Sequence, residues 1–126
     1  MGMTRLVLIA AVAVSLSAAG IANAAPPPPA PPCAFTLSAP VIEGDQVSAT
    51  VQSDWCAAAA APFLMVACLQ PGDGAAQQCS QSRGADPARV TVAYSPGVTY
   101  IANGRGCAGW IGLSPAANCQ LLGPNQ

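Results

Sequence analysis

The chain has 126 residues, of which 52% are hydrophobic, and it carries four arginines and five acidic residues but no lysine or histidine. This length corresponds to one domain. A chain so poor in cations cannot neutralise a row of phosphates, which excludes nucleic acid as a partner and weakens attraction to anionic lipid. Without histidine, Ser-His-Asp and Cys-His sites cannot be assembled, and there is no lysine to serve as a base or nucleophile.

The N-terminus has the three parts of an export signal. A short basic start is followed by the apolar run Leu6 to Leu16 and by the small-residue sequence Ala22-Asn23-Ala24. This pattern predicts a signal peptide over residues 1–24, cleaved after Ala24, and a secreted, periplasmic or cell-wall protein with no stable membrane insertion after cleavage. The alternative is an uncleaved anchor helix over residues 6–22, although alanine, serine and glycine dilute its hydrophobicity.

Residues 25–32 hold six prolines. Because proline fixes its own φ and biases the preceding residue toward extended conformations, this segment is expected to be a stiff polyproline II spacer. The alternative is that its P-x-x-P sequences are a ligand for a module with an aromatic groove.

Six cysteines in a short exported chain indicate a disulfide framework. Zinc is excluded as their use by the missing histidine and the absence of any C-x-x-C pair. Turn residues between the cysteines favour Cys68 with Cys79 and Cys107 with Cys119, which leaves Cys33 with Cys56. The rival arrangement joins Cys56 to Cys107 across two sheets.

Several short strands are expected along residues 33–126. They are an edge segment over 35–42, an alternating strand over 47–55 with Trp55 facing inward, a central strand over 63–69, and further strands over 89–94 and 98–102, the last ended by Asn103-Gly104. A helical turn is expected over 57–61, stopped by Pro62. The pattern predicts an all-β fold: a small disulfide-stapled antiparallel β-sandwich, immunoglobulin-like or barrel-like.

Two short strings support this expectation. The sequence from Val41 to Val47 resembles the turn between the first two strands of immunoglobulin-like domains, and Tyr100 to Gly104 resembles part of their penultimate strand. The composition is similar to that of small Ala/Pro-rich exported actinobacterial proteins of unassigned function. It also resembles the apoproteins of secreted chromoprotein antibiotics, a likeness that implies a sandwich with an apolar ligand in a cleft but transfers no binding residue.

The acidic residues are the only general acid–base candidates. Glu43, Asp45, Asp54, Asp73 and Asp86 all stand in turns or at a strand end, where each has an ordinary role. A glycosidase-like carboxylate pair and a calcium site at Asp73 remain as alternatives, but EF-hand spacing is absent. We therefore expect no enzymatic activity, no cofactor and no metal.

Trp110 stands out as a recognition residue. It lies beside Ile111 between two glycines, on an expected loop closed by Cys107 and Cys119, whereas Trp55 is expected in the core. The candidate ligand-binding residues are Trp110, Ile111 and Asp73; the alternative is that Trp110 and Ile111 fold back onto the end of the core.

The sequence thus predicts a non-enzymatic interaction module that binds an extracellular protein, a glycan or a small apolar ligand. A carrier of a small apolar ligand and a secreted protease inhibitor are the alternatives. The arginines are expected to be solvated or paired, for example Arg83 or Arg89 with Asp86.

Overall fold

The computed structural model describes residues 13, 30–113 and 118–126. Apart from residue 13, the predicted signal peptide lies outside the described residues, as do positions 25–29 of the proline-rich segment and the Ser114-Pro115 turn. Among the described residues, no helix is long and apolar enough to cross a membrane.

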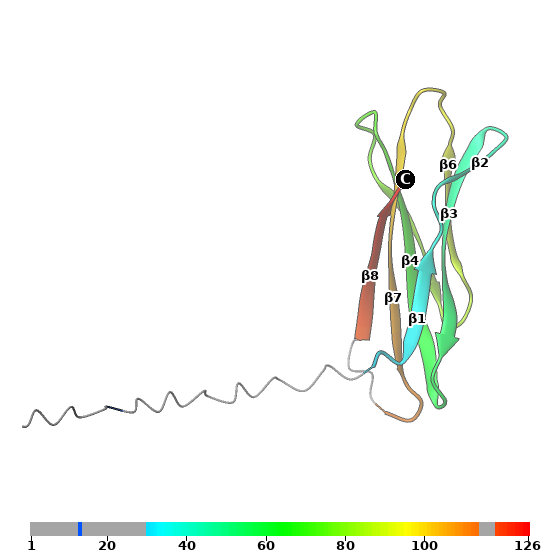
Figure 1. Ribbon diagram of the computed structural model, residues 1–126. Coiled ribbons are helices and arrows are strands. Elements are labelled where there is room, and N and C mark those ends of the chain that lie inside the picture. Colours follow the sequence, from blue (N-terminus) through cyan, green and yellow to red (C-terminus); the bar gives the residue numbers. More distant parts are fainter. Residues whose placement is uncertain (1–12, 14–29, 114–117) are drawn as a thin grey trace, which may run out of the picture.

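The described chain forms an all-β sandwich of two antiparallel sheets (Figure 1). The strands are β1 (Cys33–Leu37), β2 (Val41–Glu43), β3 (Gln46–Cys56), β4 (Ala60–Pro71), β5 (Gln78–Arg83), β6 (Ala88–Ala93), β7 (Tyr100–Trp110) and β8 (Asn118–Asn125).

In the first sheet, β3 is central. Strand β6 pairs along one side of its first half, while β2 and β1 follow one another along the other side. The second sheet has the order β5-β4-β7-β8. The small disulfide-stapled sandwich expected from the sequence is therefore the observed architecture.

Alternating side chains of both sheets meet in a core built mainly of small residues. In β6, for example, Ala88, Val90 and Val92 are buried while the residues between them are exposed. This is the period-two pattern of a strand with one wet face. The largest fully buried side chains from the opposite sheet are Met65 and Leu69 of β4.

Glycine lets the two sheets approach closely at β7. A Cβ placed at Gly106 would overlap the aromatic ring of Phe35 on β1, and one at Gly104 would lie 2.6 Å from Cγ2 of Val51. The ring of Phe35 therefore lies directly against the β7 backbone, and this contact sets the relative level of β1 and β7.

Each disulfide joins two residues that lie directly opposite one another on neighbouring strands. The bonds are Cys33–Cys56 between β1 and β3, Cys68–Cys79 between β4 and β5, and Cys107–Cys119 between β7 and β8, each with a Cα–Cα distance of 4.0 Å. These are the pairs that the sequence favours, and the Cys56–Cys107 alternative is wrong. Each bond lies within one sheet, so none of the three ties the two sheets together.

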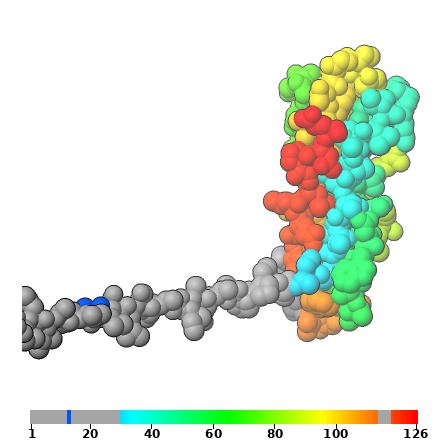
Figure 2. Space-filling model, viewed as in Figure 1, coloured from blue at the N-terminus to red at the C-terminus, as the bar shows by residue number. Residues whose placement is uncertain are grey.

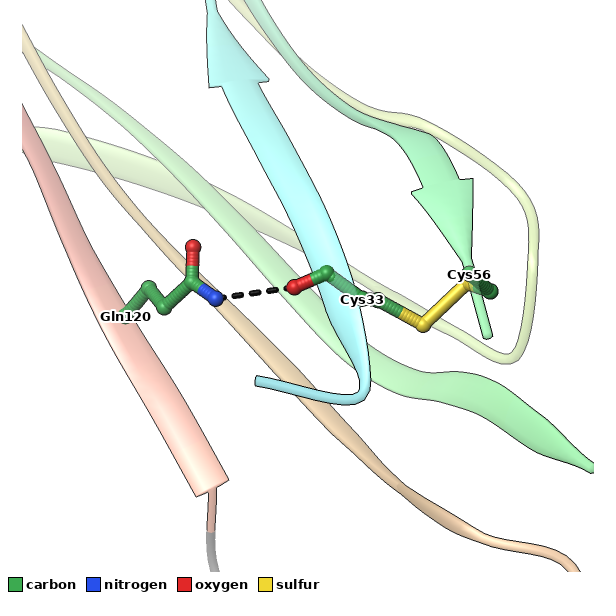
Figure 3. The surroundings of a disulfide bond; sticks show 3 residues. All are labelled: Cys33, Cys56 and Gln120. Carbon is green, nitrogen blue, oxygen red and sulfur yellow. Dashed lines mark hydrogen bonds between the residues drawn. A yellow bond between two sulfur atoms is a disulfide. The ribbon is translucent and has the colours of Figure 1, made fainter. Parts of the chain in front are cut away.

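Side-chain amides link the two sheets along one edge. Nε2 of Gln120 donates to the carbonyl oxygen of Cys33 at 2.8 Å (Figure 3). Nδ2 of Asn125 donates to the carbonyl oxygen of Leu37 at 2.9 Å. Figure 2 shows β8 and β1 side by side on this face of the molecule. Two acceptors on the outer edge of β1 are thereby satisfied by the neighbouring sheet.

The expectation that Trp55 faces inward is wrong. Phe35 lies opposite Ser53, but Ala34 lies opposite Trp55, so Asp54 is an extra residue in β3. This β-bulge reverses the alternation beyond Ser53. Cys56 then packs against the core, while Trp55 faces outward with 58% of its surface exposed.

The predicted helical turn over 57–61 is also wrong. Residues 57–60 form a tight turn in which the N–H of Ala60 donates to the carbonyl of Ala57 at 3.0 Å, and Ala59 adopts a φ of 63°. Strand β4 begins at Ala60. Alanine propensity for helix is overridden here by pairing of the following residues with β7.

Strand β7 is longer than expected. It does not end at Asn103-Gly104 but continues to Trp110, because glycine is accommodated where Val51 and Phe35 press against the sheet. The sequence predicts no strand in the polar stretch that contains β5 or in the C-terminal stretch that contains β8. Both are edge strands whose alternation is weak.

Tyr100 anchors the start of β7. Its hydroxyl donates to the carbonyl of Ala93 at 3.0 Å and accepts from the N–H of Ser95 at 2.8 Å. The ring of Tyr94 lies 6.2 Å from that of Tyr100, centroid to centroid. The loop between β6 and β7 is thus fixed to the strand that follows it.

Candidate functional site

The candidate site lies at the end of the sandwich where β1 begins, which we call the proximal end (the lower end in Figure 1). The turn between β3 and β4 and the end of β7 meet there. Trp110 lies opposite Ala60, and the N–H of Ile111 donates to the carbonyl of Ala59 at 2.7 Å. The backbone therefore fixes the position of the chain on both sides of Trp110.

An open apolar groove of about 280 Å³ occupies this end of the second sheet. All of its described lining residues are apolar or glycine: Ala61, Pro62, Phe63, Gly109, Trp110, Ile111 and Leu113. They come from the start of β4 and from the end of β7 with the turn that follows it.

A second β-bulge shapes the β4 side of the groove. Pro62 lies opposite Ala108 and Leu64 lies opposite Cys107, so Phe63 is the extra residue in β4. Proline is tolerated at such a position because it has no N–H to give to the ladder. The bulge places Phe63 and Pro62 together along the groove.

Trp110 lies at the last position of β7, with 43% of its surface exposed. Ile111 and Leu113 are more exposed still, at 69% and 67%. Side chains of this kind are costly to leave in water, and a concentration of them marks a surface suited to binding. The expectation of a loop is corrected in one respect: Trp110 ends a strand, and only the residues after it form the turn.

The groove offers shape and apolar contact with little polar recognition. Its described lining carries no charged side chain. Its volume of about 280 Å³ lies just below the range of about 300–1,000 Å³ for small-molecule sites. It therefore suits an uncharged ring, an aliphatic group or a few residues of an extended apolar peptide.

Asp73 does not belong to this site. It lies in the turn after β4, whereas the groove lies at the start of that strand, so the whole length of β4 separates them. Its carboxylate accepts a hydrogen bond from the N–H of Ala75 at 3.0 Å, which stabilises the turn. The structure brings Trp110 and Ile111 together and leaves Asp73 at the opposite end.

The other acidic groups are dispersed over several elements. Glu43 of β2 pairs with Arg89 of β6 at 2.9 Å, and Arg89 also donates to the hydroxyl of Ser48 at 3.3 Å. The predicted pairing of Arg89 with Asp86 is therefore wrong. Arg89 pairs with Glu43 instead, because β2 and β6 both pair with β3 and this brings the two side chains together. Asp54 accepts hydrogen bonds from Thr36 and from a neighbouring glutamine.

In the described part of the chain, no group of three or more histidine, cysteine or acidic residues is placed to hold a metal ion. All six cysteines are in disulfides.

Of the residues that line the groove, the sequence selects Trp110 and Ile111 as candidates and does not select Pro62, Phe63 and Leu113. The sequence predicts a central strand at Phe63, and its only signal for a bulge is the proline beside that residue. Comparisons of the chain with family models, with curated proteins and with solved structures find no match.

Proposed function

We propose that the chain is an exported, non-enzymatic binding module that takes an uncharged apolar ligand in the groove at Trp110. The observation that carries this proposal is the position of Trp110, Ile111 and Leu113, which line one groove and keep between 43% and 69% of their surface exposed. A small domain gains nothing in stability from keeping such side chains in water, so binding is the simplest reason for them.

Export is supported by the disulfides. Three of them suggest an oxidising environment outside the cytosol, which agrees with the signal peptide expected from residues 1–24. We propose that the mature protein acts in the extracellular medium or at the cell envelope.

We further propose that the domain is immunoglobulin-like. The strand order β1-β3-β6 against β5-β4-β7-β8 matches a sandwich of this architecture. The hydrogen bonds of the Tyr100 hydroxyl resemble the tyrosine corner at the start of the penultimate strand in such domains. One departure is that each disulfide stays within a sheet.

The groove favours an apolar ligand over the other partners that the sequence left open. A glycan would need polar side chains to receive its hydroxyl groups, and the described lining has none. A protease inhibitor would present a convex loop, whereas this surface is concave. An apolar side chain of a partner protein fits the same surface as a free ligand.

A neutral, environment-sensitive apolar fluorophore tests the proposal on the purified exported protein. Trp110→Ala is expected to weaken binding of this probe by about tenfold or more, as expected for an aromatic anchor. Trp55→Ala is the matched control because Trp55 is also exposed but does not line the groove. It should leave the affinity within about twofold.

A second variant keeps the test valid if the Trp110→Ala protein fails to fold. Ile111→Ser changes a residue with 69% of its surface exposed, so it should weaken binding with little effect on stability. Equal effects of the Trp55 and Trp110 substitutions, in folded proteins, would overturn the proposal.

A further inference from the structure

The proline-rich segment leaves the domain at the same end as the groove. Pro32 is fully buried, and its carbonyl accepts a hydrogen bond from the N–H of Ala57 at 2.8 Å, which fixes the point where the segment meets the sandwich. Figure 1 shows the start of β1 and the turn after β7 at this one end.

The distance to the groove follows from the register of the sheets. Phe35 lies against Gly106, which puts these residues of β1 and β7 at one level. Toward the proximal end, Cys33 lies two residues beyond Phe35 and Trp110 lies four residues beyond Gly106, which is about 7 Å and about 13 Å at 3.3 Å per residue. The start of β1 and Trp110 therefore differ by about 7 Å in level on sheets that stack about 10 Å apart, a separation of about 12 Å.

The segment and the groove match in chemistry. The side chains of residues 25–31 are all proline or alanine, so the α-ammonium of Ala25 after cleavage is the single charge of the segment, at its end farthest from the domain. The described groove lining is apolar and uncharged. Polyproline II segments bind grooves lined by aromatic side chains, since their conformation is already ordered and little entropy is lost on docking. Trp110 and Phe63 supply aromatic rings here.

We propose that the groove at Trp110 is occupied by residues 25–31 of the same chain, which compete with any other ligand. Seven residues in polyproline II conformation span about 22 Å, enough to cover the separation of about 12 Å. Attachment to the domain holds the segment at an effective concentration in the millimolar range, so that even weak docking fills the groove. This inference rests on the proposed function because it names an occupant of the same groove.

The test compares the exported protein with a spacer variant of equal length, in which Pro26→Gly, Pro27→Ser, Pro28→Gly and Pro29→Ser replace four prolines by residues that do not fix φ. Both carry Trp55→Phe, so that Trp110 is the only fluorescent tryptophan. The spacer variant is expected to bind the neutral apolar fluorophore about three- to tenfold more tightly, and its Trp110 emission should move to longer wavelength.

A synthetic peptide of residues 25–31 should reverse both changes in the spacer variant. A control peptide with glycine in place of each proline should not. Equal probe affinity with and without the prolines would overturn the inference, as would an effect that appears only with dimer formation in sedimentation velocity, because the occupant would then come from a second copy.

The outcomes separate this inference from the proposed function. If both proteins bind the probe equally and both lose binding with Trp110→Ala, the groove is a binding site and only the inference fails. If neither protein binds the probe, the proposed function fails.

Discussion

At the scale of single residues, the contact between Phe35 and Gly106 connects the fold to the site. The ring fills space that a Cβ at position 106 would need, so the two sheets approach closely at this point. Because the same contact sets the level of β1 against β7, it also determines where the proline-rich segment leaves the domain relative to Trp110.

Gly106→Ala is expected to lower the free energy of unfolding by about 1–3 kcal/mol through overpacking, measured by urea denaturation with the disulfides intact. Phe35→Leu should relieve part of the clash. The loss in the double variant should therefore be smaller than the sum of the two single losses by at least about 0.5 kcal/mol. Strict additivity would contradict direct contact of the ring with the glycine backbone.

Single residues also mark where sequence reasoning stops. Alternation in β3 is regular up to Ser53, so Trp55 has the parity of a core residue, and nothing in the residue types announces the extra position at Asp54. A bulge is decided by the register with the partner strand, which is a property of two segments. Trp110, in contrast, is recognisable as a candidate binding residue from the sequence, because the glycines that mark it lie next to it in the chain.

At the scale of elements, each disulfide reinforces one pair of neighbouring strands. The pairs were accessible from the sequence because turn-forming residues stand between Cys68 and Cys79 and between Cys107 and Cys119. Edge strands β5 and β8 could not be predicted from the sequence, because their hydrophobic patterns are weak. Each is held instead by pairing with the neighbouring strand to which a disulfide joins it.

Two disulfide deletions of nearly equal loop length should separate stability from binding. Removing Cys68–Cys79 or Cys107–Cys119 by double alanine substitution should cost about 3 kcal/mol of unfolding free energy in either case, since the bonds span 11 and 12 residues. Only the second bond lies next to the groove, three residues before Trp110. We expect the apolar probe to bind several-fold more weakly when Cys107–Cys119 is removed, and with unchanged affinity when Cys68–Cys79 is removed.

If both deletions weakened binding of the probe to the same extent, the shape of the groove would depend on the stability of the whole domain. The claim that the Cys107–Cys119 bond supports the groove locally would then be wrong. Hydrogen exchange of β8 amides provides the control: it should accelerate in the Cys107–Cys119 deletion and not in the other.

At the scale of the whole molecule, the sandwich combines strong cross-links within sheets with a modest core between them. The core is built mainly from alanine and valine with few large side chains, and the sheets are joined by packing and by the amides of Gln120 and Asn125. The fold class was predictable because short alternating segments separated by turn residues leave few other solutions. The position of the groove was not, because it depends on the bulge at Phe63.

Reduction of all three disulfides is expected to unfold the domain at 25 °C. Together the bonds contribute on the order of 9 kcal/mol, which is comparable to the whole stability of about 5–15 kcal/mol for a typical domain. Circular dichroism before and after a thiol reductant is the measurement. A reduced protein that kept its β-sheet signal and a cooperative thermal transition would show that the core suffices alone.

The most direct test of the account is to map binding residue by residue on the spacer variant by backbone amide NMR while the neutral apolar probe is added. We predict that shift changes concentrate at Ala61, Phe63, Gly109, Ile111 and Leu113, with the indole N–H of Trp110 among the largest. The turn around Asp73, at the other end of β4, should not respond. Shifts centred on that turn, or spread evenly over both sheets, would contradict the assignment of the binding site to the groove.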